Sequence, residues 1–171
     1  MAKRTPLGTV GKGRRGIGVL GWAVRGAGAG AAGTTALNAV TYLDMAIRGR
    51  GASSTPEQTV EKLASQAGIS LGEGEERENR LQGLGPLTGL AAGIGSGVLV
   101  GLLRATGLRS QPVVGTALIT AGVMAAANGP MVVMGITDPR SWSVTDWISD
   151  VVPHLAFGAV VKTTMDAFDR V

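Results

Sequence analysis

Long stretches of apolar and small residues alternate with short charged segments along this chain. Four stretches are long enough to cross a membrane as helices, given a rise of about 1.5 Å per residue and a hydrocarbon core near 30 Å thick. They cover residues 25–47, 81–103, 112–136 and 147–168. The pattern predicts an all-α fold, an integral membrane bundle of four transmembrane helices, with the fourth helix running from about Val144 to Phe168.

Residues 48–80 form a polar section between the first and second spans. Thr55 is the expected N-cap of a short helix, with Pro56 at its first position and Gln58 completing a capping box. Gly68 is its expected stop. The apolar residues share one narrow helical face, at Val60, Leu63, Ala64 and Ala67. We expect an amphipathic surface helix that lies on the membrane or against the bundle.

Glycine recurs at every fourth position through the second span, at Gly85, Gly89, Gly93, Gly97 and Gly101. Residues four apart lie on one face of a helix, so this face is a groove without side chains. Each interior glycine weakens a helix in water by about 1 kcal/mol, but in a bilayer small residues let two backbones approach closely. The first span carries a matching face at Gly26, Gly30 and Thr34. The spacing predicts that these two spans pack on each other.

Composition supports a membrane protein and excludes several classes. The 171 residues include 28 Gly, one His and no Cys, and only 16% are charged, against about 25% in soluble domains. Without Cys the chain has no disulfide, thiolate metal site or cysteine nucleophile. We expect no metal, no cofactor and no enzymatic activity. The basic residues lie at the ends of spans and are not interleaved with aromatics, so we expect no nucleic-acid binding.

Basic residues also predict the orientation. Residues 1–16 form a basic arm, and residues 17–171 form a single transmembrane domain. Lys and Arg near the spans are more numerous on the side of the two termini and of the 104–111 loop. This bias places both termini in the cytoplasm and the protein in the cell (inner) membrane. Trp22 and Tyr42 are expected at the two membrane interfaces, with Arg25 reaching toward the basic side.

Polar residues inside spans are costly and require a reason. Four of them are expected at similar depth under the outer surface: Asp44, Asn128, Asp150 and His154. One hypothesis is a proton-responsive or ligand-binding site in which His154 titrates. The other is a polar lock that fixes helix register. Asn38, in the middle of the first span, is expected to be buried and to bond across to another helix.

Two blocks carry a resemblance to a known family. Residues 41–50 (TYLDMAIRGR) with 52–57 (ASSTPE) resemble a block in small actinobacterial four-span inner-membrane proteins, and residues 153–158 (PHLAFG) are similar to the final-helix motif of YagU-like membrane proteins. The resemblance covers most of the chain and brings no catalytic residues. It implies an accessory subunit of a larger envelope machine, such as an Mce-type lipid-uptake transporter.

Two function classes remain from the sequence. The first is a non-enzymatic accessory or assembly subunit of a larger membrane-protein complex, surrounded by membrane lipids. Its support is a surplus of small-residue faces, because the third span also carries Gly115, Gly122 and Gly129. The alternative is a small channel or transporter that works through the cluster of Asp44 and His154.

Overall fold

The computed structural model describes residues 17–170, and the predicted basic arm of residues 1–16 lies outside them. This part of the chain is all-helical, as predicted, and contains no strand. Five α-helices and one 3-10 turn follow in order: α1 (Val19–Arg48), α2 (Thr55–Gln66), α3 (Gly74–Ala105), α4 (Pro112–Val133), η1 (Pro139–Ser141) and α5 (Val144–Phe168). Helix α5 has the predicted bounds, whereas α3 begins seven residues before the predicted span because it includes the acidic segment that precedes it.

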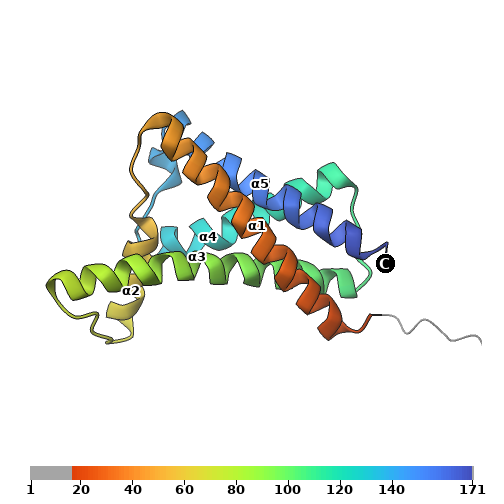
Figure 1. Ribbon diagram of the computed structural model, residues 1–171, viewed down its shortest axis with the longest axis horizontal. Coiled ribbons are helices and arrows are strands. Elements are labelled where there is room, and N and C mark those ends of the chain that lie inside the picture. Colours follow the sequence, from red (N-terminus) through yellow and green to blue (C-terminus); the bar gives the residue numbers. More distant parts are fainter. Residues whose placement is uncertain (1–16, 171) are drawn as a thin grey trace, which may run out of the picture.

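Helices α1 and α3 cross in direct backbone contact (Figure 1). A Cβ on Gly97 would lie 2.5 Å from the Gly30 Cα and closer still to the Gly26 carbonyl oxygen. A Cβ on Gly101 would collide with the Trp22 carbonyl, and one on Gly93 with the Thr34 hydroxyl. The crossing therefore requires glycine, because any side chain would push the two backbones apart.

The remaining glycines of the α3 groove have other surroundings. Gly85 faces Pro56 and Glu57 at the start of α2, whereas a Cβ on Gly89 would meet no atom within 4 Å. The groove thus serves two neighbours, α1 at its second half and α2 at its beginning, with a gap between them.

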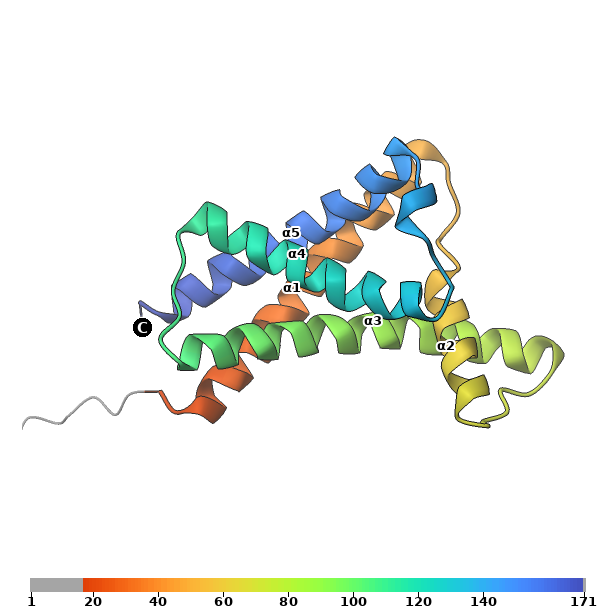
Figure 2. The same cartoon turned by 180° about the vertical axis from the view of Figure 1, so that it is seen from behind.

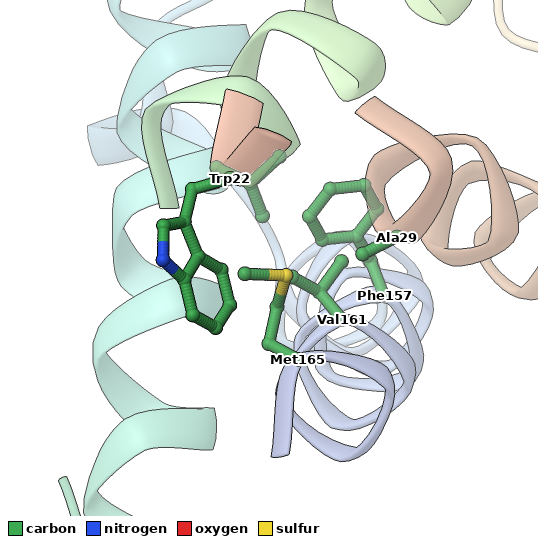
Figure 3. Packing of buried hydrophobic residues seen from close by; sticks show 6 residues of the cluster. Trp22, Ala29, Phe157, Val161 and Met165 are labelled. Atoms are coloured by element: carbon green, nitrogen blue, oxygen red, sulfur yellow. The ribbon is translucent and has the colours of Figure 1, made fainter. Parts of the chain in front are cut away.

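Helix α5 lies beside α1 and holds the core of the molecule. Phe157, Val161 and Met165 have no exposed surface, and they pack with Trp22 and Ala29 of α1 (Figure 3). Gly33 makes this approach possible, because a Cβ there would lie 2.7 Å from Val161 and 2.8 Å from Phe157. Trp22, which the sequence placed at a membrane interface, is buried in this core cluster, whereas Tyr42 is exposed.

Helix α2 packs across the beginning of α3. Its N-cap is Ser54, one residue before the predicted Thr55, because the Ser54 carbonyl accepts the first helical hydrogen bond, from the Gln58 N–H at 3.0 Å. The Gln58 side chain donates to the Ser54 hydroxyl at 2.8 Å, so the predicted capping box with Thr55 does not form. Of its predicted apolar face, Val60 and Ala64 are buried while Leu63 is half exposed. Gly68 has φ +67°, a left-handed conformation that ends the helix as predicted.

Helix α4 packs mainly on α5 and ends at Val133, three residues before the predicted end of the third span. Gly135, with φ +71°, makes the turn that follows. Within residues 17–170, α3 and α4 are the helices both long and apolar enough to cross a membrane. Large apolar side chains are exposed along both helices, among them Leu99, Val113 and Leu118.

Candidate functional site

A polar cavity of about 430 Å³ lies at the end of the molecule where α1 ends and α5 begins. The 49–54 connection and the first turns of α5 meet at this end (Figure 2). Its wall includes several charged and polar side chains: Arg48, Arg50, Asn128, Asp146, Ser149, Asp150 and His154. Three of the four residues predicted to cluster therefore line one cavity.

Asp150 is the centre of the cluster. Its carboxylate accepts a hydrogen bond from the Asn128 amide at 2.9 Å, which joins α4 to α5. The His154 Nδ1 lies 2.7 Å from the Asp150 backbone oxygen and 3.5 Å from its carboxylate. A carbonyl oxygen can only accept, so Nδ1 donates its hydrogen to it. The geometry supplies an interhelical lock and fixes the orientation of the His154 ring.

Asp44 does not join this cluster, which corrects the sequence-based grouping. Its carboxylate accepts from Arg48 at 2.8 Å and from Arg50 at 2.6 Å. The reason is local: Arg48 lies one turn along α1, and Gly49, with φ +62°, turns the chain so that Arg50 comes back to the same carboxylate. Arg48 also donates to the Ser149 hydroxyl at 2.7 Å, so Asp44 reaches the cavity only through its arginines.

The first turn of α5 adds an anion to the cavity wall. Ser143 and Asp146 form a capping box, in which each side chain accepts from the other residue's backbone N–H. The Ser143 hydroxyl and N–H, with the more distant Arg48, hold the pKa of Asp146 below its ordinary value. Trp142 and Trp147 stack edge to face beside it, with ring centroids 5.0 Å apart. The cavity thus combines two guanidinium groups, two carboxylates and one imidazole.

A second charged cluster lies at the opposite end of the molecule. Lys162 and Asp166, one turn apart on α5, form an ion pair, and Arg104 of α3 also donates to Asp166. Arg109 pairs with Asp169 at 2.9 Å and stacks on Trp22. Sequence reasoning missed the role of Arg104, which it took for a topology signal at the end of a span. The available signal was that α3 has no acid within reach of Arg104 on its own face.

Asn38 is also placed differently from the prediction. It is exposed on the outside of α1, and its side chain makes no hydrogen bond with another residue of the described chain. The reason is rotational: Gly26, Gly30 and Gly33 turn toward α3 and α5, and position 38 lies off that face.

Comparison with protein-family models, with curated proteins and with solved structures finds no match to this chain. The family resemblance of residues 41–57 and 153–158 therefore stays a prediction. Within residues 17–170, no group of three or more His, Asp or Glu side chains is arranged to hold a metal ion.

Proposed function

We propose that this chain is a four-span integral membrane protein that serves as a non-enzymatic subunit of a larger cell-envelope complex. Helices α1 and α5 join α3 and α4 as spans, because they pack between them and expose large apolar residues such as Leu20, Leu43 and Leu155. In lipid, the packing inside such a bundle comes from close backbone contact, as at the α1–α3 crossing.

The observation that carries the subunit proposal is the outer face of α1. Four small residues on one side of the helix are exposed: Gly28, Ala32, Thr35 and Ala39. A Cβ on Gly28 would meet no atom within 4 Å. This face repeats the small-residue spacing that α1 uses toward α3, but no helix of the described chain covers it.

Asn38 beside this face strengthens the proposal. A primary amide in contact with hydrocarbon loses its hydrogen bonds to water, and amides in spans usually bond across to another helix. An exposed Asn38 in the middle of a span is therefore best satisfied by a neighbouring protein. A lipid-handling complex is the neighbour that the sequence resemblance suggests.

The alternative of a small channel or transporter has the polar cavity in its favour. However, the interior beyond that cavity is filled by Phe157, Val161 and Met165, which have no exposed surface. A pore would need polar groups at several depths along one path. The filled core favours the subunit over a pore through a single copy.

Site-directed crosslinking tests the proposal directly, because the chain has no native cysteine. A photoreactive group is attached at Thr35→Cys, with Leu118→Cys on α4 as the control, and membranes are irradiated. We expect position 35, but not 118, to crosslink to a different membrane protein, and Gly28→Leu to abolish that product and the stoichiometric co-purification of the same protein. Gly95→Leu, at an equally open glycine of α3, should retain both.

Two outcomes would contradict the subunit proposal. Position 35 joined to a second copy of this chain would indicate a homo-oligomer and favour the channel or transporter. Crosslinking to lipid alone at both positions would leave the α1 face without a protein partner.

A further inference from the structure

A groove of about 390 Å³ runs between α3 and α4, with α5 as its floor. Its walls are mostly apolar, with Leu99, Leu103, Leu118 and Val123 among the lining residues. Along α4 it extends from Gly115 to Ala126, roughly 16 Å at helical rise. One leaflet of a bilayer has a hydrocarbon depth of about 15 Å, so the groove matches the length of one leaflet.

The groove is basic at one end. Arg104, Arg109 and Lys162 all line it there, beside the loop that joins α3 to α4. Arg104 and Lys162 are 6% and 4% exposed, and Lys162 packs against Gly115 of α4, where a Cβ would displace the end of its side chain. The chain thus buries two cations next to the apolar groove. Buried charges are costly in a membrane, and they mark functional positions in membrane proteins.

The carboxylates at this end do not balance the cations. Asp166 accepts from both Arg104 and Lys162, and Asp169 forms ion pairs with both Arg104 and Arg109. Arg25 lies at the same end, stacked on Trp22 and Phe168. Among the described residues, four cationic side chains and two carboxylates therefore lie at this end, and the buried Arg104 Nε makes no hydrogen bond but lies 3.4 Å from the Asp169 carboxylate. The remaining charge complements an anion.

We propose that this groove binds an anionic phospholipid, with one acyl chain along α3 and α4 and the phosphate at Arg104, Arg109 and Lys162. The groove is charged at one end and apolar along the rest of its length. A phospholipid in one leaflet has the same arrangement, with its charged headgroup at the interface and its acyl chains toward the membrane centre. Basic pockets between transmembrane helices bind anionic headgroups in this way, and the predicted orientation places this end in the cytoplasmic leaflet, which is rich in anionic lipid. The site rests on the proposed membrane location but not on the α1 partner.

Native mass spectrometry of the full chain in detergent tests the lipid site. Phosphatidylglycerol and phosphatidylcholine with the same acyl chains are added in equal amounts. We expect one phosphatidylglycerol to be retained with about tenfold preference, close to 1.4 kcal/mol. Gly122→Phe should place a ring in the groove, since Gly122 lines it and a Cβ there meets no atom within 4 Å, and Arg109→Gln should remove a cation at the mouth.

Matched controls separate the site from general effects. Gly95→Phe adds the same side chain at another open glycine, and Arg80→Gln removes an exposed, ion-paired arginine outside the groove. We expect both to keep the wild-type preference, while Gly122→Phe and Arg109→Gln lower it by about fivefold or more.

Two results would overturn the lipid site while leaving the membrane proposal intact. One is equal retention of the two lipids by the wild type. The other is an unchanged preference in folded Gly122→Phe. Extraction of the wild-type chain from membranes without detergent would instead contradict the membrane location itself. A protein crosslinked at position 118 in the groove would show that the groove is a protein interface.

Discussion

Gly97 is the residue at which the fold has the least freedom. Its α-hydrogens lie where the α1 backbone passes, and a methyl group there would require the two helices to separate. Glycine at this position weakens the helix itself but allows direct backbone contact with α1. The net effect is stabilising where close helix packing, rather than the hydrophobic effect in water, drives assembly.

Gly97→Ala should therefore destabilise the protein by about 1–3 kcal/mol, the usual cost of forcing extra atoms into a packed site. Gly95→Ala, two residues away on the same helix, should be neutral or stabilising because its added methyl meets nothing within 4 Å. Reversible unfolding in mixed micelles measures both. Equal stability of the two variants would mean that α1 and α3 do not cross as described.

Single substitutions can test separately the two roles considered for the Asn128–Asp150–His154 cluster, an interhelical lock and a proton-responsive site. Asn128→Ala removes the hydrogen bond between α4 and α5 and should lower the free energy of unfolding by about 1 kcal/mol. His154→Ala leaves that bond in place. If His154 serves a proton-responsive site, the variant should remain abundant in the membrane while the cellular function of the protein is impaired. Loss of the His154→Ala protein from the membrane would assign the residue to the lock instead.

Asp146 provides a pH-dependent test of the α5 cap. Its pKa is lowered from 3.8 in the folded protein by Ser143, so the cap contributes stability above the ordinary pKa and loses it as pH falls through the lowered value. Ser143→Ala should raise the pKa of Asp146 toward 3.8. Carboxyl NMR titration in micelles measures this, and an unchanged pKa would contradict the capping box.

At the level of helices, sequence patterns correctly predicted the features that depend on residues close together in the chain. The four-residue glycine spacing predicted the mutual faces of α1 and α3, and Gly68 predicted the end of α2, because each depends on residues within a few turns. The position of Trp22, the partners of Asp44 and the exposure of Asn38 depend on which helices become neighbours and how each is rotated. The spacing of residues within one segment does not show which helices become its neighbours or how the segment is rotated toward them.

The ion pair between Arg104 of α3 and Asp166 of α5 depends on which helices become neighbours, because the two residues are far apart in sequence. We expect a double-mutant cycle with Arg104→Met and Asp166→Asn to give a coupling energy of about 1–2 kcal/mol, because both groups are largely buried. Unfolding in detergent of the two single variants and the double variant measures it. Additive effects would show that the ion pair does not hold the helices together.

The whole molecule has two distinct ends. The beginning of α1, the end of α3, the beginning of α4 and the end of α5 gather at one end, and the 49–54 connection, η1 and the beginning of α5 at the other (Figures 1 and 2). The cluster around Arg104 and Asp166 lies at the first end and the polar cavity at the second. This distribution fits a protein with apolar sides between two charged ends, as a four-span bundle requires.

The central claim, a four-span membrane protein with this orientation, is tested most directly by labelling single cysteines in the cysteine-free chain. Lys62→Cys in α2, Arg140→Cys in η1 and Leu108→Cys in the α3–α4 loop are treated with a membrane-impermeant maleimide in intact spheroplasts, with Leu118→Cys as the buried-in-lipid reference. The proposal predicts labelling of positions 62 and 140 at once, of 108 only after permeabilisation, and of 118 in neither case. Labelling of 108 but not 62 in intact spheroplasts would reverse the orientation, and efficient labelling of 118 would contradict a membrane-embedded bundle.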